Sequence, residues 1–320
     1  MITLDDLQAS VMDKSAFNTL SDFYSLGLAF LEFLERTQPT HIVSPKDELY
    51  FFYQYDQAYR YKITRPLNSL LFFKSKSALQ AACERFAAFL LDLKKHQEAI
   101  SERRGTQEYL VSNEINRVVY TLQQSIGCIS DSFENPNRSR KRVGQLFETL
   151  VKLIIQEVGL VCESRTLRIP IPGYEEEGYQ MTYELDLVFS RDKVVITSET
   201  NLIHPSEVVG SVKTTSKDRL DKIFLDKFML TQLLGREIPV IAIFLHDIQR
   251  ARTHRGQSIF GVNSTFKSNH FLGYTVALTR LDGVYYVDRR PVMVKDPRLS
   301  REIQDFQRFL VKDLWSLSAR

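Results

Sequence analysis

The chain has 320 residues, of which 43% are hydrophobic and 25% charged, so it contains enough apolar material for one large core or two unequal ones. No stretch approaches the roughly 20 uncharged apolar residues that span a bilayer, and the N-terminus lacks a basic region followed by an apolar run, so we expect neither a membrane protein nor a secreted one. The net charge of +3 does not by itself indicate a nucleic-acid partner, because the remaining surface can cancel a basic groove.

The three cysteines, Cys83, Cys128 and Cys162, lie far apart and follow no spacing typical of zinc ligands. We interpret them as buried thiols of a protein in a reducing cytoplasm. The histidines show no paired metal spacing. The sequence also lacks the glycine-rich nucleotide motifs and the serine-hydrolase motif, which argues against nucleotide-dependent and serine-hydrolase chemistry.

The first 130 residues predict a mostly helical region, because apolar residues recur at helical spacing over Phe17–Leu34, Ala78–Leu93 and Glu108–Ile126. Between the first two helices lies an aromatic stretch, Tyr50–Tyr61. It fits a buried helix, a strand or a surface on which bases stack, and burial is the commoner fate of aromatic side chains.

The polar segment Asp131–Arg142 is the best candidate for a boundary, since it combines Ser, Asn, Pro and Arg. We therefore predict a helical N-terminal region over residues 1–135 and a second region over residues 136–320. The run Asn137–Arg142 carries four positive side chains. Its simplest interpretation is a solvated loop, with a nucleic-acid contact as the alternative.

Helices and strands alternate after that boundary, which is typical of an α/β sheet with helices on both faces. A helix is predicted over Val143–Val158, followed by strands. The segment Met181–Phe189 alternates apolar and polar residues and would place Glu184 and Asp186 on one face of a strand. The other predicted elements are strands at Leu160–Ile171, Lys193–Thr197, Glu207–Lys213 and Pro239–Leu245, a helix at Ser216–Leu234, a hairpin at Tyr274–Leu278 and Gly283–Val287, and a closing helix at Arg301–Leu317.

A candidate catalytic cluster combines Asp186 with Ser211 and Lys213, which are two residues apart and project from the same face of their strand. If the two strands are neighbours, Asp186 and Lys213 converge on one point. Carboxylates that hold magnesium beside a lysine can activate water and neutralise a phosphate, as hydrolysis of a phosphodiester requires. The alternative is a structural salt bridge between strands, which is common and contributes little.

A second carboxylate is expected on the helix that follows Lys213. Its apolar residues define a buried stripe, and Asp226 flanks that stripe, where an acid is either paired or functional. Glu148, on the helix over Val143–Val158, is a further candidate, although amphipathic helices also carry many surface glutamates. The residues of the buried stripe are Leu220, Ile223, Phe224, Lys227, Leu230 and Leu234.

These residues resemble the PD-(D/E)XK nucleases, and within them the type II restriction endonucleases that recognise CCGG or CCNGG cores. That branch carries an Asp, then Ser-x-Lys, and has its second acid about thirteen or fourteen positions beyond the lysine; here 226 minus 213 is 13. It also has a basic-acidic-basic cluster just after the lysine, and this chain has Lys217-Asp218-Arg219 there. The resemblance covers Gly144–Leu234, and it departs from the branch in having Asp226 for Glu and Lys217 for Arg.

The resemblance implies a restriction-endonuclease-like core over residues 136–320, with a mixed central sheet flanked by helices. It implies Mg²⁺ as cofactor, held by Asp186, Asp226 and Glu148. Residues 1–135 would supply dimer contacts, DNA contacts or both. Arg219 would contact guanine N7 and O6 and Asp218 the cytosine amino group, whereas Lys217 cannot make the forked bonds of an arginine.

The expected substrate is double-stranded DNA with a palindromic site, bound by a homodimer or tetramer. We also expect a DNA methyltransferase that acts on the same site. The expected location is the bacterial cytoplasm. Three alternatives stay open: a repair or structure-selective nuclease on the same fold, a DNA-binding protein that does not cut, and a merely solvated helical turn at Lys217-Asp218-Arg219. The polar stretch Gln249–His270 fits a loop against DNA as well as an ordinary loop.

Overall fold

Long amphipathic helices dominate the N-terminal part of the computed structural model, which describes residues 2–95, 110–174, 176–192, 202–217, 219–251 and 260–319. The helical region predicted from the sequence is therefore confirmed. Reciprocal hydrogen bonds between Thr3 and Asp6 cap the first helix. The bounds are α1 (Leu4–Met12), α2 (Leu20–Thr37), α3 (Lys76–Lys95), α6 (Glu114–Asp131) and α7 (Pro136–Glu157).

The basic run Asn137–Arg142 forms the first turns of α7, so its interpretation as a solvated loop is wrong. The side chain of Asn135 accepts hydrogen bonds from the backbone N–H groups of Asn137 and Arg138, and Pro136 occupies the first turn. Both features favour a helix start, because they satisfy or remove donors that have no partner within the helix.

The aromatic stretch Tyr50–Tyr61 contains the middle strand of a small antiparallel sheet, β1-β2-β3. Tyr50, Phe51, Phe52 and Tyr53 are all buried, so packing explains them and stacking on bases does not. The bounds are β1 (Thr40–Val43), β2 (Tyr50–Gln54), the 3-10 turn η1 (Gln57–Tyr59) and β3 (Leu67–Asn68).

A six-stranded mixed sheet in the order β11-β10-β7-β6-β5-β4 forms the centre of the remaining chain. The ladders β4–β5 and β5–β6 are antiparallel, whereas β6–β7, β7–β10 and β10–β11 are parallel. The α/β fold with a mixed central sheet is confirmed, while the predicted strand Lys193–Thr197 lies outside the described residues. The bounds are β4 (Val161–Pro170), β5 (Gln180–Ser190), β6 (Val208–Thr215), β7 (Val240–His246), β10 (Gly283–Tyr286) and β11 (Ile303–Asp305).

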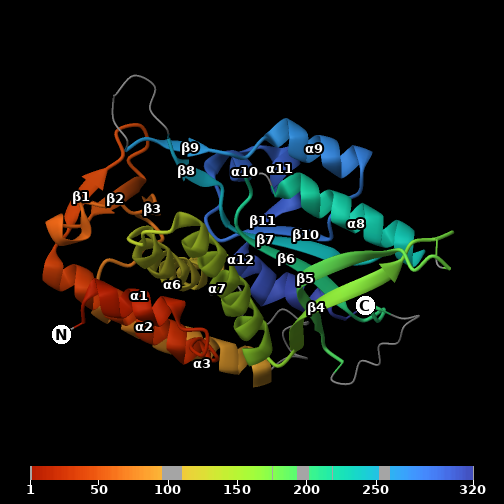
Figure 1. Cartoon of the computed structure of the whole chain (residues 1–320), viewed down its shortest axis with the longest axis horizontal. Coiled ribbons are helices and arrows are strands. Elements are labelled where there is room, and N and C mark those ends of the chain that lie inside the picture. Colours follow the sequence, from red (N-terminus) through yellow and green to blue (C-terminus); the bar gives the residue numbers. More distant parts are fainter. Residues whose placement is uncertain are drawn as a thin grey trace.

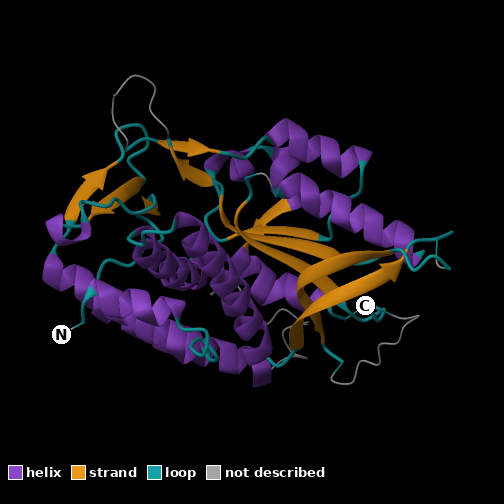
Figure 2. Cartoon of the chain, in the orientation of Figure 1, coloured by secondary structure: helices purple, strands orange, loops and turns teal. Residues whose placement is uncertain are grey.

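Helices cover both faces of this sheet, α8 and α9 on one side and α7 on the other (Figures 1 and 2). Alternate residues along each strand separate into two hydrophobic clusters, as the two-residue period of a strand requires. In β6, for example, Val212 belongs to the α7 side and Val209 to the α8 side. The bounds are α8 (Leu220–Leu234) and α9 (Ser268–Ala277).

The cluster on the α7 side is shared with the N-terminal helices. It runs from Leu4 to Leu317 and includes residues of α1, α2, α3, α6 and α7 together with sheet residues such as Leu187 and Ile243. The N-terminal region therefore packs directly on one face of the central sheet, by way of α7.

Two elements predicted near the C-terminus are wrong. Tyr274 lies in α9 and does not form a hairpin with β10, which pairs instead in parallel with β7 and β11. The closing helix over Arg301–Leu317 is interrupted, because buried Ile303 pairs with Val284 in the sheet. The bounds are α10 (Pro291–Lys295), α11 (Pro297–Glu302), α12 (Phe306–Arg308), the π-helix η2 (Phe309–Asp313) and α13 (Leu314–Leu317).

The polar stretch Gln249–His270 is only in part a loop. Its ends form the two-stranded sheet of β8 (Ile248–Arg250) and β9 (Val262–Ser264) and the start of α9, whereas residues 252–259 are outside the described part. Within the described residues, no helix combines the length and apolar character needed to cross a membrane.

Candidate active site

Strand β5 contains a β-bulge at Asp186. In the ladder between β4 and β5, the pairs Glu163–Val188 and Arg165–Leu185 enclose one residue of β4 but two of β5, namely Asp186 and its C-terminal neighbour. Such an extra residue is left unpaired, bends the strand and re-aims its side chain, and bulges are frequent next to active sites.

The bulge breaks the alternation that the sequence predicts for this strand. Leu185 and Val188 both pack on the α8 side, whereas Leu187 and Phe189 pack on the α7 side. The prediction that one face along Met181–Phe189 is polar throughout is therefore wrong, because the apolar residues change from one face of the sheet to the other at the bulge. The sheet stays filled on both faces while Asp186 turns toward β6.

The Asp186 carboxylate is bound by three groups from β6. Its Oδ2 accepts hydrogen bonds from Ser211 Oγ at 3.1 Å and from the backbone N–H of Val212 at 2.8 Å, and it forms an ion pair with Lys213 Nζ. The β5–β6 ladder ends at the pair Leu187–Gly210, so the carboxylate takes the place of a backbone acceptor for Val212. The structure thus brings together three residues of the predicted site.

Glu148 approaches the same lysine from α7. Its Oε1 lies 3.6 Å from Lys213 Nζ, and both side chains are about two-thirds or more buried. Burial first, and then the negative charge of Asp186, raise the pKa of Glu148 to about 7, against the opposing effect of Lys213. The cluster therefore contains more negative charge than its one lysine neutralises.

Asp226 approaches from α8, on the opposite side of the sheet from α7. It is half-buried next to the apolar stripe, as predicted, and burial is the main reason why its pKa is raised. The charges of Lys213 and Asp186 also act on it, in opposite directions. Asp226 is therefore within electrostatic reach of the cluster and would supply a further carboxylate for a cation bound there.

The donor set suits a hard divalent cation, because carboxylate oxygens are the ligands that Mg²⁺ prefers. Burial, and after it the charge of Asp186, raises the pKa of Glu148, and a cation bound beside both acids would favour their ionised forms. Among the described residues, no three acidic, histidine or cysteine side chains already stand in metal-binding positions. Glu148, Asp186 and Asp226 would have to converge further on binding.

The turn between β6 and α8 carries the predicted recognition residues. Lys217 is exposed, and its Nζ donates to Gln249 Oε1 at 3.2 Å, while Arg219 is exposed as the N-cap residue of α8. Asp218 lies outside the described residues. This turn follows Lys213 directly in the chain. The residues proposed to contact bases are therefore only a few positions away from a residue proposed to contact the phosphate.

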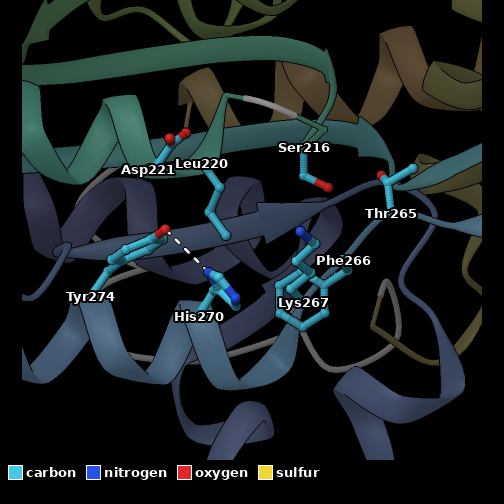
Figure 3. A pocket seen from close by; sticks show the side chains of 8 residues that line it. All are labelled: Ser216, Leu220, Asp221, Thr265, Phe266, Lys267, His270 and Tyr274. Carbon is cyan, nitrogen blue, oxygen red and sulfur yellow. Dashed lines mark hydrogen bonds between the residues drawn. The ribbon is translucent and has the colours of Figure 1, made fainter.

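A hollow of about 110 Å³ adjoins this turn (Figure 3). On one side are Ser216, Leu220 and Asp221, and on the other are residues of α9 and the segment before it. The sequence prediction missed the side of the hollow that α9 forms, because it assigned Tyr274 to a strand. A better signal is the spacing of His270 and Tyr274, which are four apart, as on one helix face, and hydrogen-bonded at 3.3 Å.

The fold that holds this site is the restriction-endonuclease-like α/β fold. No family model matches the chain, and no curated protein matches its sequence. The crystal structure of the type IIP restriction endonuclease Kpn2I matches 98% of this chain and 98% of its own, with a TM-score of 0.68 and 15% sequence identity. A complex of the restriction endonuclease PspGI with substrate DNA matches 64% of this chain and 81% of its own, with a TM-score of 0.40 and 14% identity.

Proposed function

We propose that the protein is a type II restriction endonuclease that hydrolyses phosphodiester bonds of double-stranded DNA at a specific site. The observation that carries this proposal is the convergence of Asp186, Ser211, Lys213 and Glu148 at the bulge between β5 and β6. The fold shared with Kpn2I over nearly the whole chain supports it.

Each residue of the cluster has a distinct role in this proposal. Asp186, Glu148 and Asp226 would hold Mg²⁺, which supplies charge neutralisation at the phosphate and a more acidic bound water. Lys213 orients the attacking water and offsets negative charge on the phosphate oxygens. Ser211 and the backbone N–H of Val212 fix the Asp186 carboxylate in position.

Site recognition is assigned to the turn after β6, with a palindrome containing CCGG or CCNGG as the proposed core. Arg219 would form the forked pair of hydrogen bonds to guanine, and Asp218 would accept from cytosine. A homodimer or tetramer would match a two-fold symmetric site. A methyltransferase modifying the same site in the bacterial cytoplasm would protect the host DNA.

Incubation of the purified protein with plasmid DNA and MgCl₂, followed by sequencing of the ends, tests this function. We expect ends at one short sequence with a C/G core and no cleavage in EDTA. Ends without a common sequence would instead support a structure-selective nuclease. Uncut DNA in MgCl₂ together with tight binding would support a protein that only binds.

Lys213→Ala and Asp226→Ala should each lower the single-turnover cleavage rate by at least about a hundredfold while DNA binding is retained. Gln232→Ala is the control, because Gln232 is an exposed residue of the same helix that is not among the groups acting on Asp226. Full cleavage by both active-site variants would contradict the proposed chemistry.

A further inference from the structure

Helix α7 exposes a polar face that includes Glu148. Gly144, Gln145 and Glu148 stand three, four and seven residues after Lys141, so the four residues lie along one face of the helix. Lys141 and Gln145 are exposed, and Gly144 and Glu148 are partly exposed. The buried residues of the helix are Ser139, Val143, Leu146, Phe147, Leu150, Val151, Ile154 and Ile155.

Internal packing does not require the glycine on this face. A glycine inside a helix is less favourable than alanine, so it usually has a packing or functional reason. A Cβ atom at Gly144 would meet no atom within 4 Å, whereas one at Gly27 of α2 would lie 2.8 Å from Leu122. Gly144 therefore leaves the helix backbone open toward solvent, beside the candidate active site.

The charge of this end of α7 is positive. The first turn contains no acidic residue, and the helix N-terminus adds partial positive charge. Within the described residues, Lys141 makes no ion pair, whereas the Arg142 guanidinium already donates to the backbone oxygens of Val11 and Asp13. Lys141 stands two turns before Glu148, about 10 Å along the helix axis.

We propose that Lys141, Gly144 and Gln145 bind a backbone phosphate of the substrate DNA within a few nucleotides of the phosphate that is cut. This inference rests on the proposed function, because it takes Glu148 as part of the cutting centre. The lysine ammonium and the glutamine amide donate to the phosphate oxygens, and Gly144 lets the sugar-phosphate chain approach the helix. One strand of B-DNA has a phosphate about every 3.4 Å of axis, so the site falls within a few nucleotides of the cut.

Binding to a CCGG duplex in metal-free buffer, measured at several salt concentrations, tests the charge contact. Lys141→Gln should lower the slope of log K against log salt concentration by about 0.9 and weaken specific and non-specific duplexes alike. Lys94→Gln, at an exposed lysine near the end of α3, removes the same charge elsewhere and should leave the slope unchanged.

Gly144→Leu tests the close approach. The side chain enters open space and leucine favours a helix, so the unfolding temperature should stay the same or rise, while affinity for the duplex falls at least tenfold. Gly273→Leu is the matched control, because Gly273 is a helical glycine of α9 with equally open surroundings, and it should bind as the wild type does.

A series of duplexes with single neutral methylphosphonates locates the contact. At one position near the cut, the neutral phosphonate should weaken binding by the wild type. The same phosphonate should not further weaken binding by Lys141→Gln, which already lacks the contact. The proposal is overturned if the wild type binds but the salt slope of Lys141→Gln and the affinity of Gly144→Leu are unchanged. A wild type that binds no duplex overturns the proposed function and this inference with it.

Discussion

The pKa of Glu148, raised to about 7 by burial and by Asp186, makes the candidate site sensitive to pH. The unfolded chain ionises this group near its ordinary value of 4.5, so the folded protein holds the proton over a wider range. The contribution of Glu148 to the free energy of unfolding is therefore fully present below about pH 4.5 and is lost as the pH rises through about 7.

Glu148→Gln should remove that loss, because the amide cannot ionise. Measured by urea unfolding in EDTA, wild type and variant should differ little at pH 4.5, and the variant should be more stable at pH 8 by about 1 to 2 kcal/mol. Equal pH dependence of the two proteins would show that burial and Asp186 do not raise the pKa of Glu148.

Arg219→Ala should relax or abolish sequence preference. Loss of a forked contact to guanine costs about 1 to 3 kcal/mol for the specific duplex and much less for non-specific DNA. Competition binding with CCGG and scrambled duplexes measures this difference. If both duplexes weaken equally, Arg219 contacts a phosphate and not a base.

It was easier to predict from the sequence which residues belong to the candidate site than how their side chains are oriented. Asp186, Ser211 and Lys213 could be chosen because they combine an acid, a hydroxyl and an amine on predicted strands, and the structure does bring them together. The bulge at Asp186 was not predictable, because the residue pattern of β5 alternates as in a regular strand and the extra residue shows only in its pairing with β4.

Helix α8 is fixed to the sheet by a buried lysine. Lys227 is 5% exposed, and its Nζ pairs with Asp282 at 2.8 Å, while Asp282 also accepts from the backbone N–H of Val240. The sequence predicted Lys227 within the buried stripe, and the structure confirms this. Its neighbour Asp226 is thereby held at the edge of that stripe.

Lys227→Met should destabilise the protein by about 3 kcal/mol, because it leaves a buried carboxylate without its cation. Lys222→Met, on the exposed side of the same helix, should change stability by no more than about 0.5 kcal/mol. Urea unfolding of both variants provides the measurement. Similar stabilities for the two would mean that Asp282 is solvated once Lys227 is gone.

Elements with clear periodicity were predicted best, and those decided by long-range pairing were predicted worst. Helices α2, α3 and α6 follow from apolar spacing alone. Strand β11, by contrast, is three residues long and exists because Ile303 pairs with a strand some twenty positions earlier in the chain. Local patterns cannot show such a partner.

The whole molecule depends on contacts between its N-terminal and C-terminal parts. Besides the shared hydrophobic cluster, Tyr50 Oη and Asn68 Nδ2 both donate to the buried carboxylate of Asp288, at 2.9 and 2.8 Å. The boundary near residue 135, taken from composition, thus separates regions that differ in secondary structure and share one core.

A fragment of residues 136–320 should fail to fold alone. It would expose the apolar faces of α7 and of the sheet, including Phe147, Leu150 and Ile243, to water. Expression of this fragment with and without co-expressed residues 1–135 tests the expectation by solubility and circular dichroism. A soluble, cooperatively unfolding fragment would show that the two parts are independent.

The acids of the candidate site come from helices on opposite sides of one sheet, Glu148 from α7 and Asp226 from α8, with Asp186 between them. No short peptide segment contains all of them, so we expect that grafting a loop cannot transfer the proposed activity to another scaffold. If the proposed function holds, recombination with a restriction endonuclease of the same fold should give active chimeras only when both helical layers come from the same parent.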